Sequence, residues 1–359
     1  MTTDSEAAPL SLAPRIPAPK GAPTPTFVAR WDLDKTYLRT DFDTMRDLLR
    51  TAVERPDQKR TVPGAATLMR ELSDAGAEIH ILSGSPEQLR SRIVEKLRLD
   101  GVRFQTLTLK PNLQNLLRLR FRAIRGQLGY KLPTLLMRRA ELPTQRTDDG
   151  ELLAEALFGD DAEADAFVYS LYADVCQGAV DGAELAEVMR LGDCYPDDIE
   201  RALHYVSYIV PGPAVERILI HLERQTSPAD FDGYGGRVVP FYNYLQAAFV
   251  LHEDGRLGAR QVLRVAQDLA LRHHFDGGSL ARSYLDLARR GHVAGASIPG
   301  LVATYAEWLA QGRVAGASDL SEMVRELEEH GPELPPRPSR PAPSLDYPRM
   351  VRDHNRRRR

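Results

Sequence analysis

Two aspartates stand at alternate positions directly after a short apolar run near the N-terminus. Residues 27–36 read Phe-Val-Ala-Arg-Trp-Asp-Leu-Asp-Lys-Thr, which places Asp32, Asp34 and Thr36 two residues apart. The aromatic and β-branched residues predict a buried strand that carries the acids at its C-terminal end. Because side chains alternate along a strand, we expect Asp32 and Asp34 on one side of it, where their charges repel unless a cation lies between them. Ligation by oxygen alone favours Mg²⁺.

Such a pair of carboxylates suits phosphoryl transfer through an aspartyl phosphate. One carboxylate attacks phosphorus, and the other protonates the leaving oxygen and then activates water. The same spacing of two aspartates is also common in turns and helix caps, so Asp32 and Asp34 alone do not decide between the two interpretations.

A second segment combines an apolar run with serine and glycine. Residues 78–86 read Glu-Ile-His-Ile-Leu-Ser-Gly-Ser-Pro, which predicts a strand that ends at Ser83 and Gly84. The Ser83 hydroxyl and the backbone N–H groups of the following turn can bind a phosphoryl oxygen. The alternative is an ordinary Ser-Gly turn with a helix cap at Ser85.

A lysine and an acidic run follow further along the chain. Lys131 precedes a helical pattern over Leu132–Leu142 and can neutralise a phosphate and a nucleophile together, although a lysine at a helix start is usually just solvated. Residues 156–165 read Ala-Leu-Phe-Gly-Asp-Asp-Ala-Glu-Ala-Asp, an apolar run whose acidic end suits a metal site. The alternative is an acidic start to the next helix, which the helix dipole favours. Four such segments in this order indicate a single site.

The ordered set of D-x-D-x-T, a strand-ending serine, a lysine and G-D-x-x-x-D resembles the haloacid dehalogenase (HAD) superfamily. More narrowly, the chain is similar to bacterial relatives of the actin-patch phosphatidate phosphatase family, whose catalytic domain is related to lipins. The residues that carry this similarity are Leu82-Ser83-Gly84-Ser85-Pro86, Lys131 with Leu142-Pro143 beyond it, and Gly159-Asp160 before an acidic run and Tyr169. The similarity covers residues 27–175.

This resemblance implies catalytic and phosphate-binding roles. Asp32 would be the nucleophile and Asp34 the general acid and base. Thr36 and Ser83-Gly84 would position the loop and the phosphoryl group, and Lys131 would stabilise charge.

The resemblance also implies a Mg²⁺ site. Asp32, Asp160 and the backbone carbonyl of Asp34 would bind the ion, and Asp161 or Asp165 would complete or support the metal shell. Asp161 stands where a serine or glycine is common in the family.

Residues 27–175 alternate between strand-like and helix-like patterns, including a helix over Pro63–Ala75, and predict a doubly wound parallel sheet of the Rossmann type. The resemblance narrows this prediction to a HAD-like α/β domain over residues 27–180. The stretch 37–61 is short, so we expect a small or absent cap and an open site. No obvious strand follows Tyr169.

The rest of the chain is expected to be helical or disordered. Residues 181–330 predict an all-α domain, with helices over Ala183–Leu191, Asp197–Val206, Ala214–Gln225, Val239–His252, Ala259–His273, Leu280–Arg290, Ile298–Ala310 and Ser318–Glu329. The Pro- and Ala-rich residues 1–26 and the Pro- and Arg-rich residues 331–359 are expected to be disordered.

Composition excludes several classes of protein. A chain of 359 residues with a net charge of −3 fits two soluble domains and no bulk nucleic-acid binding. Two cysteines, Cys176 and Cys194, argue against a disulfide scaffold and fit a reducing compartment. The sequence has no apolar run long enough to span a membrane and no signal-peptide pattern, so we expect a cytoplasmic protein.

Residues 112–128 interleave arginines with apolar side chains. On a helix this pattern gives an apolar stripe with a basic face, which can lie on an anionic membrane or hold an anionic substrate. The alternative is an ordinary amphipathic helix whose arginines are solvated.

The leading hypothesis is a Mg²⁺-dependent phosphomonoester hydrolase that acts on phosphatidate or a related lipid phosphate. A second is a phosphatase for a soluble metabolite or a phosphoprotein, with the helical domain as a platform for an unidentified protein partner. A third is a non-catalytic phosphate- or lipid-binding scaffold, which would have no need of Asp34 as acid and base.

Overall fold

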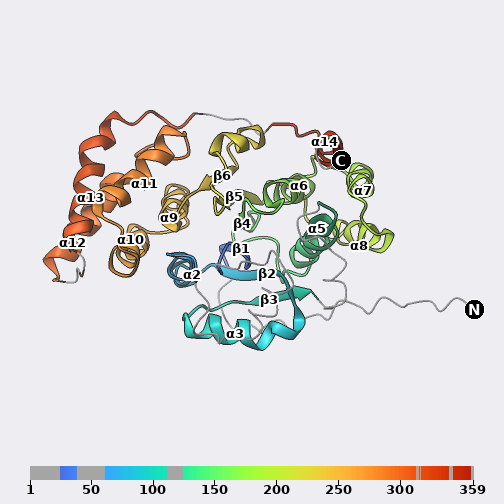
Figure 1. The fold of residues 1–359 in the computed structure, drawn as a ribbon, viewed down its shortest axis with the longest axis horizontal. Helices are drawn as coiled ribbons and strands as arrows, with labels where there is room; N and C mark the ends of the chain where they lie inside the picture. Colours follow the sequence, from blue (N-terminus) through green and yellow to red (C-terminus); the bar gives the residue numbers. More distant parts are fainter. Residues whose placement is uncertain are drawn as a thin grey trace, which may run out of the picture.

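A single parallel β-sheet forms the centre of the molecule (Figure 1). The computed structural model describes residues 25–38, 61–110, 124–312, 315, 317–338 and 343–356. Within these ranges the sheet has six strands in the order β3-β2-β1-β4-β5-β6. Their bounds are β1 Phe27–Asp32, β2 Glu78–Pro86, β3 Thr106–Lys110, β4 Ala154–Asp160, β5 Val215–His221 and β6 Val238–Phe241.

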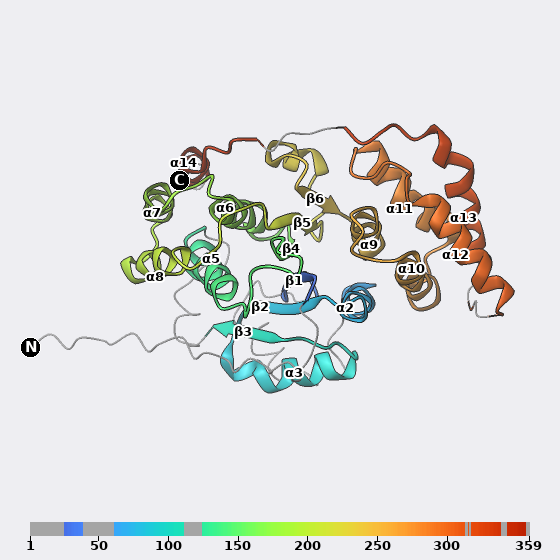
Figure 2. The ribbon, with the colours of Figure 1, turned by 180° about the vertical axis from the view of Figure 1, so that it is seen from behind.

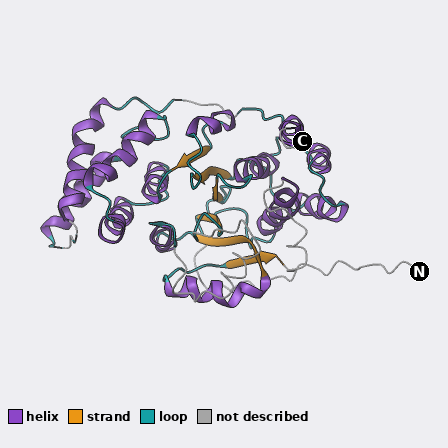
Figure 3. Ribbon diagram, in the orientation of Figure 1, coloured by secondary structure: helices purple, strands orange, loops and turns teal. Residues whose placement is uncertain are grey.

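Helices cover both faces of this sheet (Figures 1 and 3). The α-helices of the described residues are α2 Ala65–Asp74, α3 Arg90–Leu99, α5 Ile124–Ala140, α6 Asp165–Gln177, α7 Gly182–Leu191, α8 Pro196–Val206, α9 Tyr244–Glu253, α10 Ala259–His273, α11 Gly277–Arg289, α12 Ile298–Ala310, α13 Ala317–His330 and α14 Tyr347–Arg356. Short 3₁₀ turns are η2 Glu87–Leu89, η3 Pro228–Tyr234 and η4 Gly331–Glu333. None of the helices in the described ranges combines the length and apolar character needed to cross a bilayer.

Alternation along the strands divides the apolar side chains between two cores. On β4, Ala156 and Phe158 pack into the core formed with α2, α3 and α9–α13, whereas Leu157 packs into the core formed with α5–α8 and α14. Figures 1 and 2 show these two groups of helices on opposite sides of the sheet. The strands are apolar on both faces because both faces are covered. The doubly wound architecture predicted from the sequence is confirmed.

The chain order creates a switch point between β1 and β4. From β1 the chain proceeds outward through β2 and β3, then returns to the other side of β1 and proceeds outward through β4, β5 and β6. Open parallel sheets bind ligands beyond the carboxyl ends of the strands at such a point. Asp32 ends β1 and Asp160 ends β4, so both predicted metal ligands lie there.

Two strands correct the predicted helical region. The helix expected over Ala214–Gln225 is wrong, because Val215–His221 is a strand of the same sheet. The helix expected over Val239–His252 is wrong only at its start, where Val238–Phe241 is a strand, and the rest is confirmed as α9. β5 pairs in parallel with β4, and β6 pairs with β5. A short apolar run that is buried on both faces has no alternation to separate it from a buried helix. The expectations of an entirely helical segment after residue 181 and of no strand after Tyr169 are therefore wrong. The expected helices over Pro63–Ala75 and at α7, α8 and α10–α13 are confirmed within a few residues.

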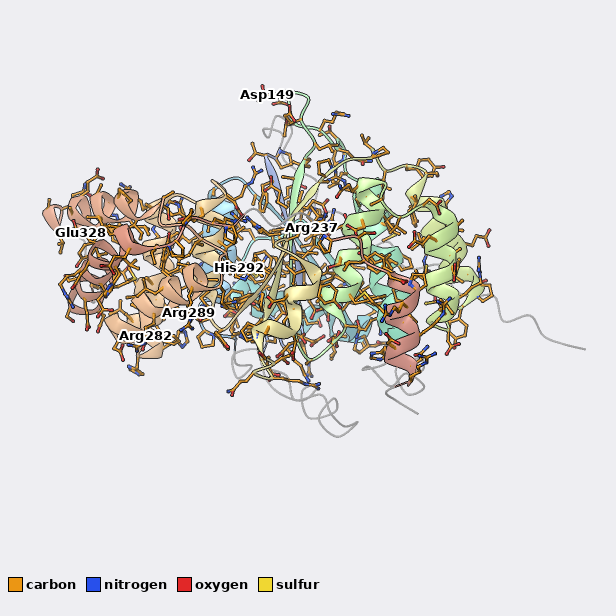
Figure 4. All side chains as sticks on the ribbon, turned by 90° about the horizontal axis from the view of Figure 1, so that it is seen from above. Asp149, Arg237, Arg282, Arg289, His292 and Glu328 are labelled. Carbon is orange, nitrogen blue, oxygen red and sulfur yellow. The ribbon has the colours of Figure 1, made fainter. Side chains whose placement is uncertain are left out.

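The expectation of a disordered tail is wrong for residues 347–356, which form α14. Tyr347 and Val351 lie one helical turn apart and are fully buried. Tyr347 donates a hydrogen bond to Asp174 of α6, and Arg237, which is labelled in Figure 4, pairs with the same carboxylate. These buried side chains and the half-buried Asp174 carboxylate dock the basic helix on α6, and Arg352 and Asn355 add contacts to α7. The predicted disorder of residues 1–24, the predicted small cap and most of the basic segment 112–128 lie outside the described residues.

A buried ion cluster joins the sheet to α5 and α6. Glu155 of β4 accepts hydrogen bonds from Arg30 at 2.6 and 2.8 Å, from Arg139 at 3.0 Å and from Tyr172 at 2.7 Å. Burial raises the pKa of Glu155, but the two guanidinium groups and the hydrogen bonds outweigh it and lower the pKa to about 2. The carboxylate is therefore ionised and fully paired between two strands and two helices.

We expect Glu155→Gln to reduce the free energy of unfolding by about 3–5 kcal/mol, because it leaves two buried guanidinium groups without their counter-charge. The loss is measured by urea denaturation at neutral pH. Since a carboxyl group with a lowered pKa stabilises the fold above its unfolded pKa, the difference from wild type should persist down to about pH 4 and shrink at lower pH. Glu95→Gln, which removes the exposed Arg98 pair, is the control and should change stability little. Equal stability of Glu155→Gln and wild type would contradict this role.

Candidate functional site

Three buried aspartates meet at the switch point of the sheet. Asp32 and Asp160 end neighbouring strands, and Asp165 is the first residue of α6. One carboxylate oxygen from each lies within 4.8 Å of the other two, and each residue is 1% exposed or less. Of the two residues proposed to complete the metal shell, the structure therefore brings Asp165 into this cluster.

Two oxygens of the cluster have no hydrogen-bond partner among the described residues. These oxygens are Asp32 Oδ2 and Asp160 Oδ2, and both are buried. The second oxygen of Asp160 accepts backbone N–H groups from Ala162 at 2.6 Å and Glu163 at 3.1 Å, which fixes the carboxylate's orientation. A buried carboxylate oxygen without a partner is costly, and a divalent cation removes that cost. The donor set consists of carboxylate oxygens, so the residues fit Mg²⁺.

Gly159 makes room for the third aspartate. A Cβ atom at position 159 would lie 2.7 Å from the Asp165 Cβ and 2.8 Å from its Cγ, closer than real contacts allow. Asp165 uses this space to accept the backbone N–H of Asp160 at 3.1 Å. The glycine before Asp160 is therefore explained by the close approach of the α6 N-terminus to the end of β4.

Lys131 of α5 forms ion pairs with three of the acidic side chains. Its ammonium lies 3.2 Å from Asp32 Oδ1, 2.8 Å from Glu163 Oε2 and 2.5 Å from Asp165 Oδ1. The prediction that Lys131 starts a helix is wrong, since α5 begins at Ile124 and Lys131 lies in its middle. Pro133, two residues later, is the kind of residue that marks a helix start, but here it lies inside the helix.

The acids outnumber the ammonium group that they surround. Burial raises the pKa of Asp32, Asp160 and Asp165, and neighbouring carboxylates raise it further, while Lys131 lowers it. Burial lowers the pKa of Lys131, but Asp165, Asp32 and Glu163 together raise it well above its usual value. The lysine thus remains charged, and a second cation is needed before all the acids ionise.

Asp34 lies beside the cluster and faces β2. It is partly exposed, and its Oδ2 accepts hydrogen bonds from the Ser83 hydroxyl at 2.8 Å and the Ser85 hydroxyl at 3.1 Å. Burial raises the pKa of Asp34, and the two serines partly offset this effect. A raised pKa favours the protonated acid, the form that gives a proton to a leaving group. Ser83, predicted to bind phosphate, donates its hydroxyl hydrogen to Asp34, and Gly84 lies half-buried between the two serines.

The loop that carries Asp34 is held by residues far along the chain. Lys35 adopts a left-handed backbone conformation with φ of 61°, and its carbonyl lies 3.3 Å from Nδ1 of His221 at the end of β5. The Tyr244 hydroxyl of α9 donates to the backbone carbonyl of Thr36. The Thr36 hydroxyl is buried with no partner among the described residues. Thr36 therefore belongs to the loop as predicted, but its backbone rather than its hydroxyl makes the contact.

Asp161 does not join the metal cluster. Its two carboxylate oxygens accept the backbone N–H groups of Arg224 at 2.9 Å and Thr226 at 3.1 Å, and so fix the turn after β5.

Sequence reasoning missed four residues near the site: His221 and Tyr244 of the segment expected to be helical, Glu163, and Lys110 at the end of β3. Glu163 had only its acidic neighbourhood as a signal. Lys110 had a clearer signal, because this charged residue follows the strand-like run Thr-Leu-Thr-Leu. Comparison with models of known protein families and with curated proteins gave no match to this chain.

We expect Gly159→Ala to weaken Mg²⁺ binding by about tenfold or more, because the added methyl group displaces the Asp165 carboxylate. The affinity is measured by isothermal titration calorimetry on purified protein. Gly233→Ala is the matched control, since a Cβ there meets nothing within 4 Å. Unchanged Mg²⁺ affinity in a folded Gly159→Ala protein would show that Asp165 takes no part in the site.

Proposed function

We propose that this protein is a Mg²⁺-dependent phosphomonoester hydrolase that works through an aspartyl phosphate on Asp32. The observation that carries the proposal is the pair of buried oxygens of Asp32 and Asp160 that have no hydrogen-bond partner in the described part of the chain, with the Lys131 ammonium beside Asp32. Asp32, Asp160 and Asp165 would hold the ion. When bound, Mg²⁺ would neutralise the charge that builds up between the carboxylates and the phosphoryl group.

The remaining steps use this chain's own side chains. The Asp32 carboxylate attacks phosphorus, and the bond from phosphorus to the ester oxygen breaks. Asp34, whose pKa is raised by burial, gives its proton to that leaving oxygen. Asp34 then takes a proton from the water that attacks the aspartyl phosphate, which frees Asp32 and releases inorganic phosphate. Lys131 holds the Asp32 carboxylate in place throughout.

The resemblance to the HAD superfamily and to the phosphatidate phosphatase family supports the same chemistry. The preference for a lipid phosphate is expected from the family resemblance and from the basic segment 112–128, most of which lies outside the described residues, so it stays a prediction. A scaffold that only binds phosphate would not require Asp34 to be held by two serines next to the nucleophile.

We expect Asp32→Asn to lower the rate of phosphate release by about a thousandfold or more, because the amide cannot attack phosphorus. The measurement is phosphate release from a panel of lipid, sugar and protein phosphates with Mg²⁺ present. Asp161→Asn is the matched control. It removes the same charge one residue from Asp160, but the Asp161 carboxylate only accepts backbone N–H groups of the turn after β5. A folded Asp32→Asn protein with activity within tenfold of wild type would exclude Asp32 as nucleophile.

Mg²⁺ affinity should rise with pH. The pKa values of Asp32, Asp160 and Asp165 are raised, and the ion binds their ionised forms, so binding should release protons. Calorimetry in buffers of different ionisation enthalpy counts those protons.

Asp160→Ala should weaken binding strongly, and chelation should remove activity in wild type. Full activity in excess chelator would rule out the metal-dependent mechanism.

A further inference from the structure

Tyr244 is a buried tyrosine that the proposed mechanism does not use. It is the first residue of α9, and its side chain is fully buried. Its ring stacks on that of Trp31, the residue before Asp32, with the ring centroids 5.5 Å apart. It also stacks on His221, which lies opposite Asp160 in the register of β5 and β4, with the centroids 5.7 Å apart. The ring is therefore held beside the ends of the strands that carry Asp32 and Asp160.

The Tyr244 hydroxyl donates a hydrogen bond to the turn that carries Asp34. Its acceptor is the backbone carbonyl of Thr36. Burial raises the pKa of Tyr244, and the nearby charges of Asp160 and Asp32 raise it further. The hydroxyl therefore keeps its proton and stays a donor to this carbonyl.

The turn after β1 is short and closed by its own backbone. The Leu33 carbonyl accepts the N–H of Leu38 at 2.9 Å, and the Lys35 N–H donates to the Leu38 carbonyl at 2.8 Å. Asp34 and Thr36 lie within this closed turn, on either side of Lys35. Because the turn is so short, a contact that fixes the Thr36 carbonyl also restrains the backbone of Asp34.

Asp34 is thus held from two sides of the site. The hydroxyl groups of Ser83 and Ser85 on β2 orient its carboxylate, whereas Tyr244 of α9 restrains the backbone to which that carboxylate is attached. A general acid must lie within hydrogen-bond reach of the leaving oxygen. A misplacement of about 1 Å can lower the rate on the order of a hundredfold, so the backbone contact bears directly on proton transfer.

We propose that Tyr244 is a positioning residue for proton transfer, whose hydroxyl acts through the Thr36 carbonyl to keep Asp34 within reach of the leaving oxygen. This inference rests on the proposed function and deepens it by assigning a substrate class, the phosphate esters of alcohols. An alkoxide is strongly basic and leaves only with a proton, so these esters need a well-placed acid. Aryl esters such as p-nitrophenyl phosphate release a weakly basic phenolate and need it far less.

The test compares phosphate release across esters whose leaving groups differ in basicity. The value of kcat/KM is measured with Mg²⁺ on aryl phosphates from p-nitrophenyl to phenyl phosphate and on glycerol 2-phosphate. Tyr244→Phe keeps the stacked ring and removes the hydroxyl. It should lower kcat/KM by about tenfold or more for the ester with the most basic leaving group, and by less than about twofold for p-nitrophenyl phosphate. The plot of log kcat/KM against the pKa of the leaving group should therefore become steeper.

Two further variants calibrate this slope. Asp34→Asn removes the acid itself and should steepen the slope at least as much as Tyr244→Phe. Tyr284→Phe is the matched control, because it removes another fully buried tyrosine hydroxyl from the same apolar core, where the hydroxyl donates to Glu253. It should leave the slope unchanged. The Mg²⁺ affinity of Tyr244→Phe should equal that of wild type, since the three clustered carboxylates are untouched.

Hydrogen–deuterium exchange tests the contact without turnover. The amides of residues 33–38 should exchange faster in Tyr244→Phe than in wild type or Tyr284→Phe, because the turn has lost its anchor. Amides of β1 should exchange as in wild type, which shows that the variant is folded. Unchanged exchange in the turn would mean that the hydroxyl does not fix it and would overturn the inference.

Two kinetic outcomes also overturn the inference. If Tyr244→Phe lowers kcat/KM equally for all esters, the hydroxyl serves the nucleophile or the metal rather than proton transfer. If the slope is unchanged, the position of the turn does not reach the acid. Failure of the proposed function would appear separately, as absence of phosphate release by wild type from every ester, and the exchange measurement would then still show whether the anchor exists.

Discussion

The placement of one ammonium group, that of Lys131, among buried carboxylates is the constraint on which the site depends. Asp32 ends β1, Asp165 starts α6 and Glu163 lies in the turn between β4 and α6, and Lys131 contacts all three. Carboxylates this deeply buried repel one another and resist ionisation unless cations offset them. The packing of α5 against the sheet, through Leu128, Leu132 and Leu136, is therefore also what makes the acids compatible with burial.

The same helix supplies a second cation to a different cluster. Arg139 of α5 reaches Glu155, which Arg30 and Tyr172 also bind. The Glu155 cluster has more guanidinium groups than carboxylates, and both Glu155 oxygens accept hydrogen bonds. The Lys131 cluster has more carboxylates than ammonium groups, and two of its oxygens have no hydrogen-bond partner among the described residues. The contrast distinguishes an ion cluster that is fully paired from one that could hold a metal ion.

The sequence indicated which residues lie together better than it indicated the sheet that positions them. Asp32, Asp34, Ser83, Lys131 and Asp160 were expected together because their residue types and order suit one reaction, and the structure brings them together. β5 and β6 were missed because short apolar runs buried on both faces carry no periodicity.

Contacts across long stretches of chain were beyond prediction for a different reason. Tyr244 bonds the Thr36 backbone across 208 residues, and nothing in the local sequence of either residue indicates the other. Asp161 and Asp165 were equivalent candidates until the turn after β5 was seen to occupy Asp161. Lys131 lies beside Asp32 as expected, but it lies in the middle of α5 rather than before a helix that starts at Leu132.

The contact between Tyr244 and the loop after β1 has a consequence for how the protein is made. Asp32 and Asp34 are synthesised early. β4, β5 and Tyr244 of α9, which contacts the loop after β1, are complete only after residues 154–253 have been synthesised. During most of its synthesis the growing chain therefore carries Asp32 and Asp34 without His221 and Tyr244, which contact the loop around them. Any fragment that stops near residue 180 lacks β5, β6 and Tyr244, and so exposes the β4 edge and leaves the Asp34 loop without its anchor. The loop after β1 thus acquires these contacts only once β5 and α9 have been made.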